Sequence, residues 1–195
     1  MSEGAGWAGL VLASTSGARR ALLDALGVPY QAVAPGVEED VPPGTAVEQA
    51  TQLLARRKAE AVARAHPGAL VLGADQLVEL DGSALGKPVD AAAALEQLRS
   101  LSGRSHGIIT AVCLLGPGVE RAEVDVVVMT MFALEEAELR RYVDTGEWQG
   151  CAGGYRVESR GQALFRDIQG DRTSVQGLPM LRVVRMLREA GVAVL

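Results

Sequence analysis

A short polar turn near the start of the sequence carries side chains that could hold a phosphate group. The apolar run at residues 10–13 is typical of a buried strand, and it leads into Ser14 and Ser16 and then into a predicted helix. Arg19 and Arg20 fall in the first turn of that helix, where the helix dipole disfavours a cation unless an anion lies nearby. With the free backbone amides of the helix start, these residues have the composition of a phosphate cradle. The alternative is a solvated helix start that Ser16 caps.

Lysine is rare in this chain, and both lysines stand out by their position. Only Lys58 and Lys87 are lysine, whereas the other seventeen of the nineteen basic residues are arginine. On the helix predicted at residues 46–65, Lys58 shares a strip with Leu54 and Ala61 inside the apolar face. Its ammonium must therefore either snorkel to water or meet an anion such as a ligand phosphate. Lys87 lies in a rigid Gly-Lys-Pro turn that could aim its amine at the same ligand.

Two carboxylates follow predicted strands and could act on or near a phosphate. Asp75 comes directly after the apolar run at residues 70–74, and α/β folds usually place ligands at the carboxyl ends of their strands. A lone aspartate at that point is also a common turn former. Glu39 belongs to an acidic loop after another predicted strand. Because the chain has only two histidines, these carboxylates favour a hard ion such as Mg²⁺ or Mn²⁺ over zinc. We expect His106 to be structural.

Composition and charge exclude several classes of protein. The chain has 195 residues, which suits a single domain over residues 1–195 with a substantial core. Its net charge of −5 argues against a nucleic-acid-binding surface. No apolar run reaches the roughly 18 residues that cross a bilayer, and residues 1–9 lack the pattern of a signal peptide. We expect Cys113 and Cys151 to be reduced, and the protein to be cytoplasmic with no membrane partner.

Periodicity and turn residues predict a mixed α/β protein. Helices and strands alternate early, whereas adjacent strands dominate the middle of the chain, which favours a mixed sheet over a purely parallel one. The expected helices cover residues 17–26, 46–65, a stretch capped by Asp90, residues 135–144 and a last helix from Pro179 to about residue 189. The expected strands cover residues 10–13, 30–34, 70–74 with a continuation toward 80, 107–115, 123–131 and 162–165.

Taken together, these residues resemble the Maf-like nucleoside-triphosphate pyrophosphatases over nearly the whole chain. Each matching segment is weak alone, but their order and spacing are specific. The segments are Leu12-Ala13-Ser14-Thr15-Ser16 with Arg19-Arg20 and Leu22-Leu23, Lys58-Ala59, Gly73-Ala74-Asp75, Gly86-Lys87-Pro88, Leu101-Ser102-Gly103 with His106, Ala152-Gly153-Gly154-Tyr155, and Gly177-Leu178-Pro179.

The resemblance implies a fold, a reaction and a set of site residues. The fold would be mixed α/β, with an elongated central sheet flanked by helices and two lobes that enclose a nucleotide cleft. The reaction would convert a nucleoside triphosphate to the monophosphate and pyrophosphate with a divalent metal cation, and the family suggests a homodimer. By the same resemblance, Asp75 is the proton acceptor and Glu39 the acidic-loop residue. We expect the carboxylates of Glu39 and Asp75 to be the metal ligands. The phosphate-side residues are Ser14, Arg20, Lys58 and Lys87.

Three further positions bear on the base of the nucleotide: Ala18, Gln76 and Glu158. The family branch that prefers dTTP and UTP resembles arginine, threonine and glutamine there, whereas the branch that acts on 7-methyl-GTP carries tryptophan, glutamine and glutamate. Gln76 and Glu158 match the second branch, and Ala18 matches neither. A carboxylate can accept hydrogen bonds from the N1–H and amino group of guanine, or face the positive charge of 7-methylguanine. This favours 7-methyl-GTP, with dTTP or UTP as the alternative.

Two functions of other classes stay open at this point. One is a nucleotide-binding regulator without turnover, for example in cell division, and the other is a phosphatase that uses the same anion cradle. The acid Asp75 and the two lysines speak against an inactive site. The products separate the three hypotheses, because a pyrophosphatase releases pyrophosphate, a phosphatase releases orthophosphate and a regulator releases neither.

Overall fold

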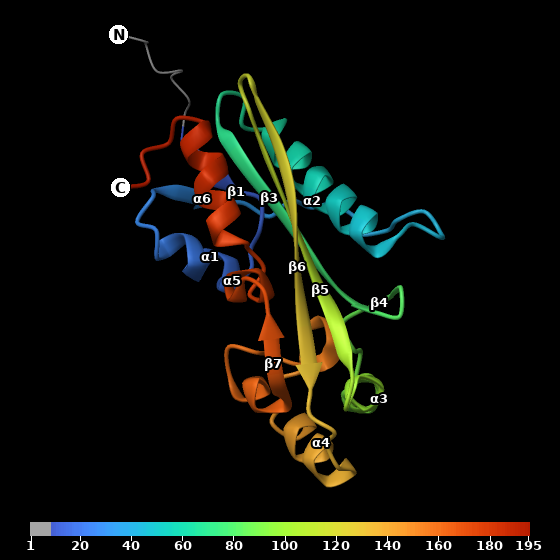
Figure 1. The fold of residues 1–195 in the computed structure, drawn as a ribbon. Coiled ribbons are helices and arrows are strands. Elements are labelled where there is room, and N and C mark those ends of the chain that lie inside the picture. Colours follow the sequence, from blue (N-terminus) through green and yellow to red (C-terminus); the bar gives the residue numbers. More distant parts are fainter. Residues whose placement is uncertain (1–8) are drawn as a thin grey trace. The chain divides into compact units, whose positions relative to one another are not determined.

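The structure, a computed structural model that describes residues 9–195, is built on one seven-stranded sheet with helices against it (Figure 1). The strand order is β2-β1-β3-β5-β6-β7, and β4 pairs with β3. The strands are β1 (Leu10–Leu12), β2 (Tyr30–Ala32), β3 (Leu70–Leu80), β4 (Ser83–Leu85), β5 (Ser105–Gly116), β6 (Val119–Met131) and β7 (Phe165–Gln169). The helices are α1 (Gly17–Asp24), α2 (Val47–Ala63), α3 (Ala91–Leu101), α4 (Glu136–Val143), α5 (Arg172–Val175) and α6 (Met180–Glu189), with 3₁₀ helices η1 (Ala152–Gly154) and η2 (Arg160–Leu164).

The sheet is mixed, as the order of the expected elements predicts. β1 pairs in parallel with both β2 and β3, whereas β3 pairs with β4, and β6 with β7, in the antiparallel sense. The prediction of a mixed α/β sheet flanked by helices is therefore confirmed. No helix in the described part, residues 9–195, is long and apolar enough to cross a membrane.

The chain divides into two compact units. Unit 1 comprises the described residues up to Gln76 together with Thr110–Asp125 and Gly177–Leu195. Unit 2 comprises Leu77–Ile109 and Val126–Gln176. Each unit has its own hydrophobic core, so each is described by itself below.

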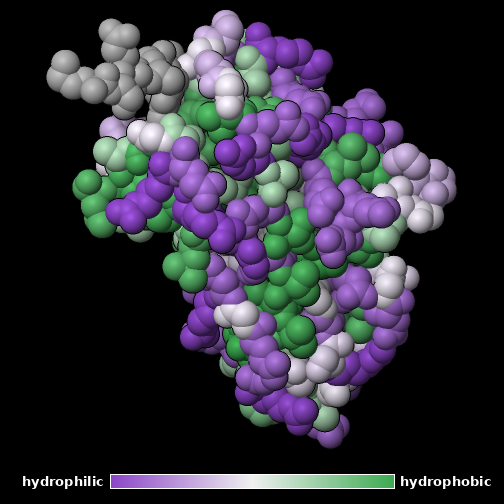
Figure 2. All heavy atoms as spheres, turned by 45° about the horizontal axis from the view of Figure 1, so that its top comes forward, coloured by the Kyte–Doolittle hydropathy of each residue, from purple (hydrophilic) through white to green (hydrophobic). Residues whose placement is uncertain are grey.

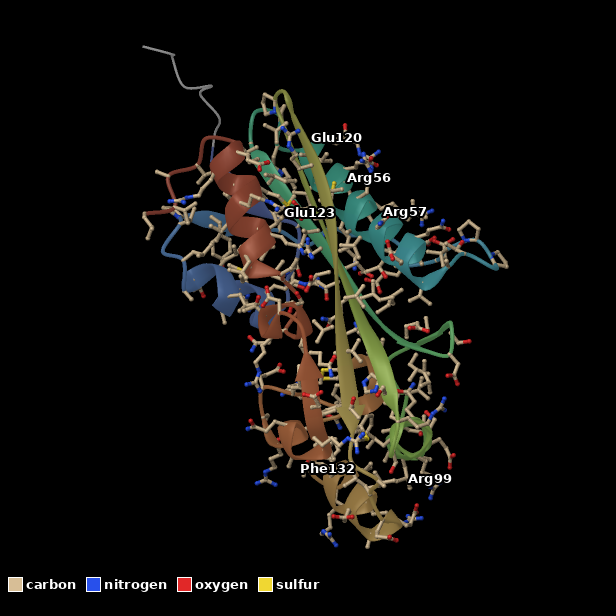
Figure 3. All side chains as sticks on the ribbon, viewed as in Figure 1. Arg56, Arg57, Arg99, Glu120, Glu123 and Phe132 are labelled. Carbon is tan, nitrogen blue, oxygen red and sulfur yellow. The ribbon has the colours of Figure 1, made fainter. Side chains whose placement is uncertain are left out.

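In unit 1, alternation along the strands supplies two apolar faces. Leu10 and Leu12 on β1 pack with α1 and α6 on one face of the sheet, whereas Val11 and Ala13 pack with α2 on the other. This is the period-two pattern of a strand that is buried on both sides. Polar contacts add to this packing at the surface. Arg56 on α2 lies 2.6 Å from Glu120 on β6, and both side chains are exposed (Figure 3).

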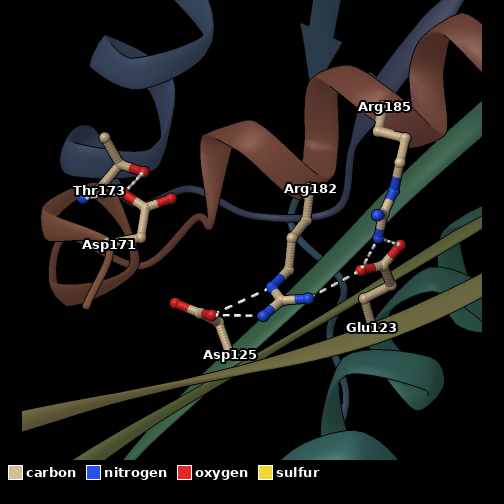
Figure 4. Close-up of polar contacts among 6 residues, drawn as sticks. All are labelled: Glu123, Asp125, Asp171, Thr173, Arg182 and Arg185. Carbon is tan, nitrogen blue, oxygen red and sulfur yellow. Dashed lines mark hydrogen bonds and ion pairs between the residues drawn. The ribbon is translucent and has the colours of Figure 1, made fainter.

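A network of charged side chains joins α6 to β6 within unit 1. Arg182 donates hydrogen bonds from Nε and Nη2 to Asp125 Oδ1, at 3.0 and 2.7 Å, and a third to Glu123 (Figure 4). Arg185 donates to both oxygens of Glu123. A planar guanidinium that bonds two carboxylates at once fixes orientation as well as position. The network therefore holds the register of α6 on the sheet.

In unit 2, α3 and α4 cover one face of the sheet. The core there includes Leu98 of α3, Tyr142 of α4, Met129 of β6 and the aromatic residues Trp148 and Tyr155. The chain has few aromatic residues, and this core holds several of them. Elsewhere hydrophilic side chains dominate the face drawn in Figure 2, with apolar side chains between them.

The strand predicted at residues 162–165 is wrong. Residues Arg160–Leu164 form the 3₁₀ helix η2, and the strand β7 begins only at Phe165. The buried pair Leu164 and Phe165 produced an apolar signal without the length that separates a strand from a turn. The close packing of Gly161 fixes the turn, because a Cβ there would lie 2.2 Å from the carbonyl oxygen of Arg156.

Other differences concern element ends and short elements. β6 begins at Val119, four residues before the predicted start. The prediction missed these residues because most of them are exposed and show no apolar alternation. The short elements β4 and α5 carried no periodic signal. The last helix begins at Met180, so Pro179, predicted as its first residue, is its N-cap.

Candidate functional site

The start of α1 has the capped geometry that its sequence predicts. Ser16 is the N-cap, and its Oγ accepts a hydrogen bond from the backbone amide of Arg19 at 3.4 Å. The amide of Ser16 in turn donates to Ser14 Oγ at 3.2 Å, and Ser14 is buried at the end of β1. Both serines thus accept hydrogen bonds from backbone amides of the local turn and fix the start of the helix.

The two arginines of α1 diverge. Arg19 is half-buried, donates from Nε to the carbonyl oxygen of Gly177 at 3.0 Å and donates from Nη1 to Ser14 Oγ at 3.4 Å. Burial lowers the pKa of Arg19, and the negative charges of Asp75 and Glu39 oppose that effect. Arg19 therefore lies within the electrostatic reach of both carboxylates.

Arg20 lies elsewhere on the helix. Its side chain is exposed, and its carbonyl oxygen accepts a hydrogen bond from the Tyr30 hydroxyl at 3.2 Å. The resemblance had placed Arg20 among the phosphate-side residues, but the geometry brings Arg19 to Ser14 and Asp75. Consecutive helical residues differ by about 100° in direction, which accounts for the different surroundings of the two arginines.

A buried ion pair joins two of the candidate site residues in unit 1. Lys58 Nζ is 2.5 Å from Asp75 Oδ1 and 2.5 Å from Glu39 Oε1. The side chains of Lys58 and Asp75 are 8% and 7% exposed, whereas that of Glu39 is 56% exposed. Lys58 thus meets anions from its place in the apolar face and does not snorkel to water. The acids that it meets belong to β3 and to the acidic loop.

Burial sets the protonation of Asp75. It raises the pKa of this carboxyl above its ordinary value, and the positive charges of Lys58 and Arg19 oppose the rise. A carboxylate in such surroundings holds a proton more readily than one in water, which suits a group that accepts a proton during a reaction.

A glycine allows the strand and the helix that carry this pair to approach closely. A Cβ at Gly73 would lie 2.3 Å from the carbonyl oxygen of Ala55 and 2.7 Å from the amide nitrogen of Ala59, both on α2. Because Gly73 has no side chain, the backbones of β3 and α2 pack directly together. Lys58, next to Ala59, then reaches Asp75. Small residues at positions 55, 59 and 73 are the feature of the sequence that permits this approach.

The predicted metal ligands, Glu39 and Asp75, lie on either side of the Lys58 ammonium. Among residues 9–195, no group of three or more histidine, cysteine, aspartate or glutamate side chains could hold a metal by itself. Mg²⁺ often binds through only one or two carboxylates, with water and substrate phosphates as its other ligands. The donor set on the protein therefore fits a Mg²⁺ or Mn²⁺ ion that arrives with a triphosphate, and does not fit a permanent metal cage.

The base-side residues fall in both units. Ala18 is half-buried on α1, and Gln76 Nε2 donates a hydrogen bond to Thr110 Oγ1 at 3.0 Å; all three residues belong to unit 1. Lys87 and Glu158 belong to unit 2, and both are exposed.

Glu158 lines a cavity in unit 2 that the sequence did not reveal. Its volume is about 270 Å³, and its walls come from the loop before β7, from β7 itself and from α5. The lining residues are Val157, Glu158, Gln162, Ile168, Arg172, Val175 and Gln176. Four of the seven side chains are polar, and of these the sequence analysis named only Glu158. The other three lie in or beside the short helices η2 and α5, which are too short to give a periodic pattern.

His106 is buried in unit 2, as a structural histidine would be. Its Nε2 lies 2.6 Å from the hydroxyl oxygen of Tyr155, whose ring packs edge-on against Phe165. Burial lowers the pKa of His106 to about 4. The neutral imidazole therefore packs with the rings of Tyr155 and Phe165.

Comparisons with known proteins agree with one another. Residues 9–190 match the family model described as Maf-like protein. A 7-methyl-GTP pyrophosphatase of Pseudomonas aeruginosa is 40% identical over 95% of this chain and 98% of its own. A dTTP/UTP pyrophosphatase of Symbiobacterium thermophilum is 41% identical over 93% of this chain and 94% of its own. Relatives with the two names are thus about equally similar to this chain.

Proposed function

Because the chain belongs to the family of Maf-like proteins, we propose that it is a nucleoside-triphosphate pyrophosphatase. The reaction is hydrolysis of the α–β phosphoanhydride, which gives the nucleoside monophosphate and pyrophosphate. One observation carries the proposal: the buried Lys58–Asp75 ion pair, within reach of Arg19 and Glu39. A buried acid beside cations, here within strand β3, is an arrangement suited to phosphoryl chemistry. Relatives named pyrophosphatases support the same reaction.

In this proposal the cations of unit 1 act on the phosphates. Lys58 and Arg19 neutralise charge on the triphosphate and stabilise the charge that develops on the pyrophosphate leaving group. Ser14 and Ser16 orient the start of α1, whose amides add hydrogen-bond donors. Lys87 belongs to unit 2 and is proposed as a phosphate-side residue on the resemblance alone, and Arg19 is proposed for the part that the resemblance gave to Arg20.

Asp75 is the proposed proton acceptor for the attacking water. Its raised pKa gives it the proton affinity that general-base catalysis needs, while Lys58 keeps it ionised for the step. Glu39 and Asp75 would hold a divalent cation, which supplies further neutralisation of the phosphates when it is bound.

For the base, we propose a preference for 7-methyl-GTP. The support is Glu158 in the cavity of unit 2, because a carboxylate can face a cationic purine and accept hydrogen bonds from its N1 and amino groups. Gln76 points to the same branch. Ala18 cannot stack on a base as an aromatic side chain would. The stacking contact expected from tryptophan at this position in the 7-methyl-GTP branch is therefore absent. Since relatives of both names are similar to about the same degree, dTTP or UTP is the alternative.

A substrate panel tests the proposed function. Purified protein with Mg²⁺ or Mn²⁺ is given 7-methyl-GTP, GTP, UTP and dTTP, and the products are separated by anion-exchange chromatography. We expect monophosphate and pyrophosphate in equal amounts, with 7-methyl-GTP the best substrate. Higher turnover of UTP or dTTP would overturn the choice of base. Release of orthophosphate alone would make the protein a phosphatase, and binding without any product would make it a regulator.

A further inference from the structure

The cavity of unit 2 contains a cation as well as the carboxylate of Glu158. Arg172 and Glu158 both line it, together with the amides of Gln162 and Gln176. Its volume of about 270 Å³ lies near the lower end of small-molecule sites and has room for one fused ring system. The resemblance that singled out Glu158 gave no role to Arg172. A base in this cavity would therefore meet the guanidinium of Arg172, which played no part in the choice of 7-methyl-GTP above.

Arg172 is held by its own helix. It is the first residue of α5, whose N-cap Asp171 accepts hydrogen bonds at Oδ1 from the amide of Thr173 at 2.8 Å and from its hydroxyl at 2.7 Å (Figure 4). These two bonds fix the turn on which Arg172 stands. Gln176 ends the same helix, so one wall of the cavity is a single braced element.

The segment that carries Glu158 is also held by hydrogen bonds. Glu147 Oε1 accepts a hydrogen bond from Ser159 Oγ at 2.7 Å, directly after Glu158. The hydroxyl oxygen of Tyr142 accepts one from the amide of Arg156 at 2.9 Å, two residues before Glu158. Two partly buried hydrogen bonds thus flank Glu158. The cavity presents a carboxylate and a guanidinium on elements whose backbones are both held in place.

This pair of charges matches the two edges of a guanine. One edge carries the N1–H and amino donors, which a carboxylate accepts, and the other carries the acceptors O6 and N7, which an arginine binds with two parallel hydrogen bonds. A methyl group on N7 removes one of these acceptors and gives the ring a positive charge. Glu158 favours that charge, whereas the guanidinium of Arg172 repels it.

We propose that Arg172 is a second base-side specificity residue, which recognises the O6/N7 edge of guanine and weakens the preference for the methylated base. The inference rests on the proposed function, since it assigns a part of the same substrate. Its consequence is that GTP is hydrolysed alongside 7-methyl-GTP. The selectivity between the two nucleotides then depends on two opposing effects on the positive charge of 7-methylguanine. Glu158 attracts this charge, and Arg172 repels it.

Substitution of Arg172 tests the inference. In Arg172→Leu the ratio of kcat/KM for 7-methyl-GTP to kcat/KM for GTP should rise at least about fivefold, the lower end of what a bidentate arginine–guanine contact contributes. Arg172→Lys keeps the charge but loses the planar pair of donors, so its ratio should rise less. The matched control is Arg166→Leu, an exposed arginine on β7 outside the cavity lining, which should leave the ratio unchanged.

Equilibrium binding separates this inference from the proposed function. Dissociation constants of GTP and 7-methyl-GTP are measured by calorimetry for the wild type and the three variants. If the wild type binds both nucleotides but releases no pyrophosphate, the proposed function fails, and the ratio of dissociation constants still decides the role of Arg172. An unchanged ratio in Arg172→Leu, or an equal change in Arg166→Leu, would overturn the inference. Failure of both nucleotides to bind would overturn both proposals.

Discussion

The close approach of β3 and α2 at Gly73 gives the most specific prediction about what holds the candidate site together. In Gly73→Ala, the new Cβ would lie 2.3 Å from the carbonyl oxygen of Ala55, whereas ordinary contact begins at 3.4 Å. The helix must therefore withdraw by about 1 Å, because the obstructing atoms are backbone atoms that cannot rotate away. Overpacking of this kind costs about 1–3 kcal/mol of unfolding free energy. The same movement carries Lys58 away from Asp75, and a 1 Å misplacement can lower turnover about 100-fold.

Two measurements on Gly73→Ala check this reasoning. Urea unfolding should show a lower midpoint at an unchanged dependence on denaturant, which marks a loss of stability and not a change of the unfolded state. Pyrophosphate release should fall about 100-fold under conditions where the variant is still folded. Gly86→Ala is the control for stability, because no atom lies within 4 Å of its Cβ position and its φ is not positive. If the two variants were equally stable, the account of the strand–helix contact would be refuted.

The remaining predictions concern single charges. Arg19→Lys should lower kcat/KM at least about tenfold, because lysine cannot reproduce the hydrogen bond from Nε to the carbonyl oxygen of Gly177. In the matched control Arg20→Lys, kcat/KM should stay within about twofold of the wild type. Equal losses in the two variants would contradict the distinction between the two arginines. Lys58→Met should raise the pKa of Asp75 further, since its main counter-charge is gone, and the acidic limb of the pH–rate profile should move to higher pH. The pKa of His106 is lowered to about 4 in the folded protein, so its contribution to stability is present above pH 6.5 and is lost as the pH falls toward 4. That loss amounts to about 3 kcal/mol, and unfolding curves at pH 7.5 and 4 should show it in the wild type and not in His106→Gln.

Local patterns predicted much of the fold and part of the site. The N-cap Ser16 and the position of Lys58 in the apolar face depend on residues a few places away, and the structure agrees with both. The prediction that Asp75 ends a strand is wrong, because β3 continues to Leu80; its side chain meets Lys58 from within the strand. The first two features follow from the periods of helices and strands, so a single sequence contains them.

Features that depend on distant contacts were not predictable in this way. Arg19 and Arg20 are adjacent in the sequence, and what distinguishes them is the carbonyl of Gly177, 158 residues further along the chain. The cavity lined by Glu158 and Arg172 is formed by turns whose backbone is fixed by side-chain hydrogen bonds. Neither the Arg19–Gly177 contact nor the cavity gives a periodic pattern in the sequence, because the residues involved meet only in the folded protein.

Pyrophosphate release by Asp75→Asn tests the central claim most directly. Asparagine has nearly the same shape but cannot accept the proton of the attacking water, and the loss of a general base typically costs about 10²–10⁴ in rate. We predict that the wild type releases pyrophosphate from its best triphosphate, and that Asp75→Asn, with an unchanged circular-dichroism spectrum, releases it at least about 100-fold more slowly. Near-normal pyrophosphate release by the folded variant would contradict the account.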